Sequence, residues 1–229
     1  MTEDIGEIRQ LIDEFNSFLS DAEGLILYKL GKNLLQGQSG VIIGNREALV
    51  WLAKGTVAGN GNRVYYFTPP GTGDPGVMNM EDTLSIMLTR AGIRDTVAFI
   101  SNTYQKMKVR QKGKVGLLFI CGAAYEETKG IILDWQSNLT PEAKVLFHRC
   151  DLPDTARVIK ECLGDLGDFR LWKIIDTLTV ITIDKCTHHW IINSGDKGIC
   201  KYCKRHRDFK RILKDLQKRN IKAGKRPNN

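Results

Sequence analysis

The chain has 229 residues, of which 42% are hydrophobic, enough for one medium-sized α/β domain with an appendage or for two small domains. No apolar run approaches the length of a transmembrane helix, and the acidic, polar residues after Met1 lack the pattern of a signal peptide. The net charge of +8 is uneven: from Cys186 onward 13 Lys and Arg residues face three Asp residues, whereas the preceding residues carry 21 basic and 23 acidic side chains.

Alternating helices and strands are predicted before residue 186. Apolar residues at helical spacing predict helices within 1–21 and over 24–35, 47–54, 80–91, 125–138 and 153–163. Short, continuously apolar runs predict strands over 41–43, 64–67, 97–100, 116–120, 144–147, 171–175 and 178–183. Because most of these strands are apolar throughout and separated by helices, they indicate a parallel sheet covered on both faces. The last two form an antiparallel pair, so we predict a Rossmann-like, mixed seven-stranded sheet.

Two short clusters of metal ligands, Cys186-Thr-His-His189 and Cys200-Lys-Tyr-Cys203, follow the predicted sheet. Cys-x2-His followed by Cys-x2-Cys supplies the four ligands of a closed tetrahedral zinc site. His188 competes with His189 as a ligand, and the two-residue gap favours His189. Because protein side chains fill all four positions, we expect a structural zinc ion and no zinc catalysis. The alternative is a loop of reduced cysteines with a surface histidine pair.

Basic side chains dominate the chain after the second cluster. Phe209, Ile212, Leu213 and Leu216 recur at helical spacing and predict a helix with a narrow apolar stripe and a cationic remainder. Such a helix could contact RNA or DNA phosphates, an acidic protein or an anionic membrane surface, or it could simply be solvated. The candidate nucleic-acid-binding residues are Lys204, Arg205, Arg207, Lys210, Arg211 and Lys214.

The three remaining cysteines are Cys121, Cys150 and Cys162, and their scattered positions do not resemble a disulfide framework. We therefore expect a reducing, cytoplasmic location. Cys121 and Cys150 follow adjacent predicted strands and could form a nucleophilic or redox pair, although free cysteines are most often small buried hydrophobic residues.

Several motifs of the body occur in the order and spacing of a known family: Val50-Trp-Leu-Ala-Lys-Gly55, Gly116-Leu-Leu-Phe-Ile-Cys-Gly122, Asp134-Trp135, Leu139-Thr-Pro141 and Phe147-His148. Through them residues 22–183 resemble the class I S-adenosylmethionine-dependent methyltransferases, in particular the bacterial branch of sugar and macrolide O-methyltransferases and cephalosporin-hydroxylase-like proteins. The resemblance implies a cofactor site at the strand ends, formed by Gly44, Asn45, Thr68 and Cys121.

The same strand ends depart from the family pattern. The turn at Gly44-Asn45 is short and has no acidic residue before it, and Thr68 stands where the family has an acid for the ribose hydroxyls. Cys121-Gly-Ala-Ala124 and His148-Arg149 lack the acids that some relatives use for a divalent metal. We therefore expect a degraded S-adenosylmethionine site and a non-catalytic protein that acts by binding; the alternative is an active methyltransferase with a divergent cofactor site.

His148 is the remaining candidate for chemistry. An imidazole can act as a general base at neutral pH, and Asp151 is the nearest acid in the sequence. The alternative is a strand-end histidine satisfied by one hydrogen bond. Taken together, these features divide the chain into an N-terminal helix (1–21), a methyltransferase-like Rossmann domain (22–185), a zinc-knuckle module (186–206) and a basic helix and tail (207–229).

Overall fold

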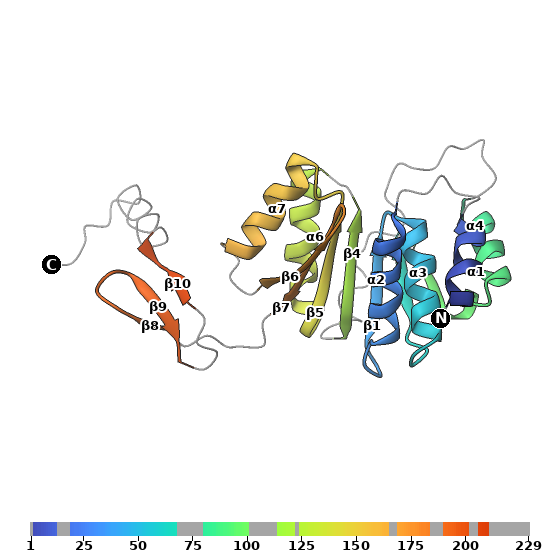
Figure 1. Ribbon diagram of the computed structural model, residues 1–229, viewed down its shortest axis with the longest axis horizontal. Helices are drawn as coiled ribbons and strands as arrows, with labels where there is room; N and C mark the ends of the chain where they lie inside the picture. The colour runs from blue at the N-terminus through green and yellow to red at the C-terminus, as the bar shows by residue number, and fades with distance from the viewer. Residues whose placement is uncertain are drawn as a thin grey trace. The chain divides into compact units, whose positions relative to one another are not determined.

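The computed structural model (Figure 1) describes residues 2–12, 19–67, 80–100, 114–121, 124–164, 169–183, 190–201 and 206–210. The chain divides into two compact units, Met1–Asp184 and Lys185–Asn229. Among the described helices, none combines the length and the apolar character needed to cross a lipid bilayer.

The first unit contains a seven-stranded sheet in the order β3-β2-β1-β4-β5-β7-β6. Five neighbouring strands are parallel, and β7 runs antiparallel to both β5 and β6. The predicted Rossmann-like mixed sheet is therefore confirmed. Its strands are β1 (Ser39–Ile43), β2 (Val64–Phe67), β3 (Val97–Ile100), β4 (Val115–Cys121), β5 (Leu139–His148), β6 (Phe169–Ile175) and β7 (Leu178–Ile183).

The central strands β1 and β4 are buried on both faces of the sheet, whereas the edge strand β6 is largely exposed. Successive side chains of a strand point to opposite sides, so the two faces form separate apolar clusters. Ile42 and Phe119 belong to one apolar cluster, whereas Leu118 and Val145 belong to a second one. The first cluster includes side chains of α1 (Thr2–Ile12), α2 (Asp21–Lys32), α3 (Arg46–Val57) and α4 (Met80–Arg90), and the second includes α6 (Tyr125–Trp135) and α7 (Pro153–Gly164). Short 3₁₀ turns, η1 (Arg94–Thr96) and η3 (Gln136–Asn138), precede β3 and β5.

Helices α2 and α3 pack closely through glycine. A Cβ atom added to Gly55 would lie 2.2 Å from the Tyr28 carbonyl oxygen, and one added to Gly31 would lie 2.5 Å from that of Leu52. These contacts are between backbones, so a side chain at either position would force the helices apart. The pairing matters for the site below, because the N-termini of α2 and α3 each supply polar groups to it.

The second unit contains a three-stranded antiparallel sheet in the order β10-β9-β8, formed by β8 (Trp190–Ile192), β9 (Lys197–Cys200) and β10 (His206–Asp208). The rings of Trp190 and Phe209 meet edge to face at 5.4 Å, and Phe209 covers Gly198 so closely that a Cβ there would lie 2.5 Å from the ring. The sequence did not predict this sheet, and β10 crosses the predicted boundary between residues 206 and 207.

Candidate functional site

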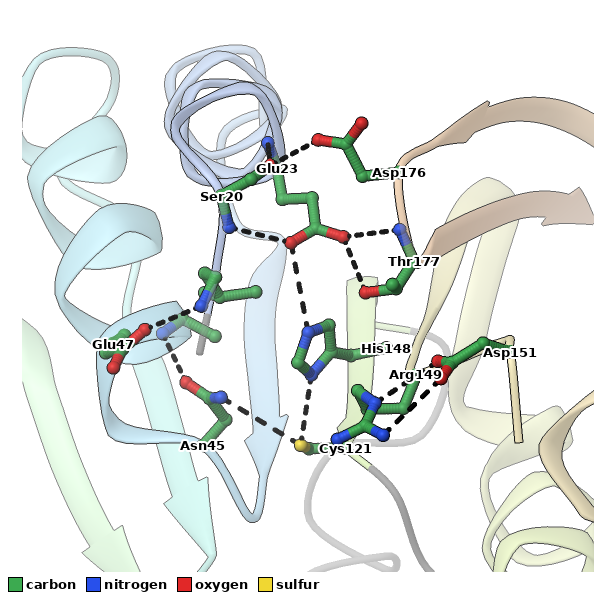
Figure 2. Close-up of polar contacts among 12 residues, drawn as sticks. Ser20, Glu23, Asn45, Glu47, Cys121, His148, Arg149, Asp151, Asp176 and Thr177 are labelled. Atoms are coloured by element: carbon green, nitrogen blue, oxygen red, sulfur yellow. Dashed lines mark hydrogen bonds and ion pairs between the residues drawn. The ribbon is translucent and has the colours of Figure 1, made fainter. Parts of the chain in front are cut away.

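The carboxyl ends of three parallel strands bring the candidate residues of the body together. Ile43 of β1 is in register with Ile120 of β4, and Cys121 is in register with His148 at the end of β5. Ligands of open α/β sheets bind at this edge. The side chains that meet here come from the strand ends, from the N-termini of α2 and α3, and from the β6–β7 turn (Figure 2).

Glu23 is a buried carboxylate that accepts hydrogen bonds from three donors. It is the third residue of α2, where it forms a capping box with Ser20: the Ser20 N–H donates to Glu23 Oε2 at 2.9 Å, and the Ser20 hydroxyl accepts from the Glu23 N–H. The other oxygen, Oε1, accepts from the N–H and the hydroxyl of Thr177 at 2.9 and 2.8 Å. The Glu23 carboxylate thus joins α2 to the turn between β6 and β7 (Figure 2).

His148 lies between this carboxylate and a thiol. Its Nε2 is 3.8 Å from Glu23 Oε2, and its Nδ1 is 3.3 Å from Cys121 Sγ. His148 and Glu23 are only 1% and 2% exposed, so their interaction is little screened by water. The imidazole also stacks on Phe119 at 6.1 Å. We call these three residues the Cys–His–Glu chain (Figure 2).

Asn45 connects the Cys–His–Glu chain to α3. Its side-chain oxygen caps the helix by accepting the Ala48 N–H at 2.8 Å, which turns the amide nitrogen toward Cys121 Sγ at 3.9 Å. Burial is the main reason that the pKa of Cys121 is raised above its ordinary value, although the Asn45 hydrogen bond and the Arg149 guanidinium act in the opposite direction. The resting thiol is therefore protonated at neutral pH.

A second buried carboxylate, Glu47, lies in the first turn of α3. It is 4% exposed and accepts a 3.0 Å hydrogen bond from the Leu19 N–H. Glu23 and Glu47 are the two acidic residues whose charge contributes, after burial, to the raised pKa of Cys121. Both accept hydrogen bonds from backbone amides of the segment that enters α2.

Arg149 follows β5 in the left-handed region, with φ of +61°. Its guanidinium pairs with Asp151 at 3.2 Å, and this contact lowers the pKa of the Asp151 carboxyl. The sequence indicated Asp151 as the acid nearest to His148. The structure corrects that prediction: Asp151 pairs with Arg149, and the carboxylate facing His148 is Glu23.

Three of the four predicted cofactor residues lie at this edge. Gly44 adopts the left-handed conformation that glycine favours, with φ of +86°, directly before Asn45, and Asn45 contacts Cys121. The fourth, Thr68, lies outside the described residues. The turn at Gly44 fits a close approach of a ligand to the backbone, and the two buried acids Glu23 and Glu47 already accept hydrogen bonds from backbone amides.

The predicted zinc ligands fall almost entirely outside the described residues. Cys186, His189 and Cys203 are outside them, and only the backbone of Cys200, at the end of β9, is described. Among the residues that the structure describes, no three His, Cys, Asp or Glu side chains group in a way that could hold a metal ion. The zinc site stays a prediction.

The predicted nucleic-acid-binding residues are also only partly described. Arg207 lies in β10, and Lys210 is exposed directly after Phe209. Lys204, Arg205, Arg211 and Lys214 lie outside the described residues. Binding through this segment stays a prediction as well.

Sequence reasoning missed Glu23, although a signal was present. Ser20-Asp-Ala-Glu23 has the spacing of a capping box, which marks a helix start. The motif explains why Glu23 folds back on Ser20. It does not reveal that the same carboxylate reaches Thr177, 154 positions later in the chain.

The chain matches no protein-family model and no curated protein. Solved structures are similar in fold. A Corynebacterium glutamicum protein has a TM-score of 0.63 at 14% identity, covering 82% of this chain and 92% of that one. The O-methyltransferase TomG from Streptomyces achromogenes, involved in tomaymycin synthesis and solved with SAM, has a TM-score of 0.56 at 15% identity, covering 80% and 90%.

An O-methyltransferase from Bacillus cereus, solved with SAH, has a TM-score of 0.57 at 14% identity and covers 80% of this chain and 91% of that one. Sequence identities this low to solved structures indicate a shared fold but not a shared activity. The body of this chain has the same fold as these two O-methyltransferases.

Proposed function

We propose that the chain is a methyltransferase-fold protein with a degraded S-adenosylmethionine site, which transfers no methyl group and acts by binding nucleic acid through its basic C-terminal segment. One observation carries the first half of this proposal. Glu23 and Glu47, the buried acids near the strand ends, are occupied by backbone amides.

Freeing Glu23 for a ribose would be costly. Turning its carboxylate outward would leave the Ser20 and Thr177 amides without their acceptor in a buried place. Each buried donor left unsatisfied costs about 1–3 kcal/mol. A gain from two ribose hydroxyls, which water already satisfies in solution, does not offset that loss.

The second half of the proposal is supported by charge segregation. The net charge of +8 belongs entirely to the segment after Cys186, because the preceding residues carry two more acidic than basic side chains. A strongly cationic segment that follows a nearly neutral body in the sequence is the charge pattern of a nucleic-acid-binding appendage. A structural zinc ion held by Cys186, His189, Cys200 and Cys203 would fix the fold of that segment.

Calorimetric titration with S-adenosylmethionine and S-adenosylhomocysteine tests the first half of the proposal, that the cofactor site is degraded. We expect no heat of binding and no rise in the melting temperature of a folded sample. A ligand present at a hundredfold excess over its dissociation constant would stabilise the protein by about 2.7 kcal/mol, which thermal denaturation detects readily. Micromolar binding of either compound would overturn this half of the proposal.

An active methyltransferase with a divergent cofactor site is the second candidate. The left-handed turn at Gly44 favours it, because a glycine has no side chain to keep a ligand from the backbone after β1. The structural similarity to O-methyltransferases solved with SAM or SAH also favours it. Micromolar binding in the titration would select this candidate and direct the search toward a methyl acceptor.

Replacement of a predicted zinc ligand tests the second half of the proposal, which is nucleic-acid binding by a zinc-stabilised C-terminal segment. We expect the purified chain to contain zinc and to bind a single-stranded RNA of mixed sequence, with an affinity that falls steeply as salt is raised. Cys200→Ala should lose both the zinc and the RNA binding while the seven-stranded sheet survives, since metal binding and folding of such modules are coupled. Cys150→Ala, in the body, is the matched control and should retain both.

A variant with Lys210, Arg211 and Lys214 changed to Gln separates charge from folding. We expect it to keep its zinc and to bind RNA more weakly, with a shallower dependence on salt. Full zinc retention in Cys200→Ala would show that the ligand assignment is wrong. Unchanged RNA affinity in the triple variant would show that these cations do not form the binding surface.

A further inference from the structure

We propose that Cys121, His148 and Glu23 form a nucleophile–base–carboxylate triad that accepts an acyl group from a thioester or an activated ester. This activity is independent of methyl transfer and of binding by the C-terminal segment. Cys121 and His148 are the catalytic residues, and Glu23 is a positioning residue that acts through the imidazole.

The geometry has the order that nucleophilic catalysis requires. A nucleophile must lie within hydrogen-bonding reach of a base, and the base must be oriented by a third group. Cys121 Sγ lies 3.3 Å from His148 Nδ1, and His148 Nε2 on the far side of the ring lies 3.8 Å from Glu23 Oε2. Longer contacts than those of a reacting complex are common before a substrate binds.

The neighbours of His148 favour one of its two tautomers. A neutral imidazole has one N–H and one lone pair, and the Glu23 carboxyl oxygen, 3.8 Å from Nε2, is a better acceptor than the thiol beside Nδ1. Nδ1 is then the lone-pair nitrogen, and it faces the thiol. Glu23 itself is held by the Ser20 and Thr177 amides, so it cannot rotate away without breaking those hydrogen bonds.

The proposed step is balanced in atoms and electrons. Cys121 Sγ attacks the acyl carbon while its proton passes to His148 Nδ1, which gives a tetrahedral intermediate. The bond between the acyl carbon and its leaving oxygen or sulfur then breaks, and the proton moves from His148 to the leaving group. The products are a thioester on Cys121 and a free alcohol or thiol, with no oxidant or reductant required.

Asn45 supplies a donor beside the nucleophile. Its Nδ2 points at Cys121 Sγ at 3.9 Å, while its oxygen is fixed by the cap of α3. An amide N–H in this position can stabilise the negative charge that develops on sulfur or on the acyl oxygen. Figure 2 shows the thiol between Asn45 and Arg149, whose guanidinium also favours negative charge there.

The electrostatic surroundings of Cys121 predict that His148 deprotonates the thiol during the reaction, and that no thiolate is formed beforehand. Burial raises the pKa of the thiol, so a direct thiolate reaction would require alkaline pH, whereas transfer to an imidazole operates near neutrality. The titratable and charged groups that face the thiol are Glu23 from α2, Glu47 from α3, Tyr66 from β2, and His148 and Arg149 from β5 and the turn after it.

The test is acetylation of the full-length protein by 4-nitrophenyl acetate. Release of nitrophenol is followed by absorbance, and peptide mapping by mass spectrometry locates the acetyl group among the six cysteines. We expect Cys121 to be acetylated first, at a rate that rises toward neutral pH and then levels off. Cys162, fully buried and with a pKa raised to about 12 by burial, is an internal reference that should stay unmodified.

Variants assign the roles. Cys121→Ser should abolish the fast acetylation, and Cys150→Ser should leave it unchanged. His148→Gln should slow it about 100-fold or more. Glu23→Gln should slow it less and move the profile of rate against pH to lower values, because a carboxylate at this place stabilises the protonated imidazole.

The proposal is overturned if Cys121 reacts no faster than Cys150 in the wild-type protein, or if a folded His148→Gln variant reacts at the wild-type rate. If His148→Gln does not fold, the wild-type pH profile decides. A plateau near neutral pH supports the triad, whereas a rate that keeps rising into the alkaline range shows an unassisted thiol and overturns it.

Discussion

Replacing Glu23 by Ala is expected to lower the free energy of unfolding by about 3–5 kcal/mol, because the change removes the acceptor of three buried donors and each unsatisfied donor costs about 1–3 kcal/mol. The donors that lose their acceptor are the Ser20 and Thr177 amides and the Thr177 hydroxyl. Urea denaturation followed by circular dichroism measures the loss.

Two further variants serve as controls for the loss of stability expected in Glu23→Ala. Glu126→Ala removes an exposed acid from the first turn of α6 and should cost less than about 1 kcal/mol. Glu23→Gln keeps one carbonyl oxygen as an acceptor, so it should lie between the wild type and Glu23→Ala. If Glu23→Ala loses no more stability than Glu126→Ala, then the carboxylate does not hold α2 to the β6–β7 turn.

The Gly55→Ala variant is expected to lose about 3 kcal/mol of stability through overpacking. The added methyl group would lie 2.2 Å from the Tyr28 carbonyl oxygen, and a backbone atom cannot move aside as a flexible side chain can. Helices α2 and α3 must separate, and that movement displaces Glu23 relative to Asn45. We therefore expect the Gly55→Ala variant to lose the fast acetylation of Cys121 as well.

Gly130 provides the matched control. It lies inside α6, and a Cβ added there would meet no atom within 4 Å. Gly130→Ala should raise the free energy of unfolding by about 0.5–1 kcal/mol, because alanine has a higher helix propensity. Equal melting temperatures for Gly55→Ala and Gly130→Ala would show that α2 and α3 have room between them.

The architecture of the body could be predicted from local patterns. Continuously apolar runs such as Val41-Ile-Ile43 identify buried parallel strands, and the turn at Asp176-Thr177 identifies the closing pair β6 and β7. Each of these signals lies within a few residues of the element that it predicts. The predicted mixed seven-stranded sheet is confirmed, whereas the order of its strands was not predicted and is known only from the structure.

The site could be predicted only in part, because its contacts join distant segments. His148, Cys121 and Asn45 were identifiable as residues at strand ends, where a known fold places its ligand. Glu23 was not, since no pattern within a helix shows which strand end its N-terminus will meet. The β8–β10 sheet was missed for another reason: strands of three or four residues are too short to display alternation.

The strand order also affects how the chain folds during its own synthesis. β6 leaves the ribosome before β7, yet in the sheet β7 lies between β5 and β6. Until β7 has emerged and paired with β5, the nascent β6 has no neighbouring strand to pair with. Its apolar side chains Leu171, Trp172 and Ile174 remain about half exposed even in the finished fold. A pause in translation between residues 175 and 183 would therefore prolong the period in which this segment can aggregate or recruit a chaperone.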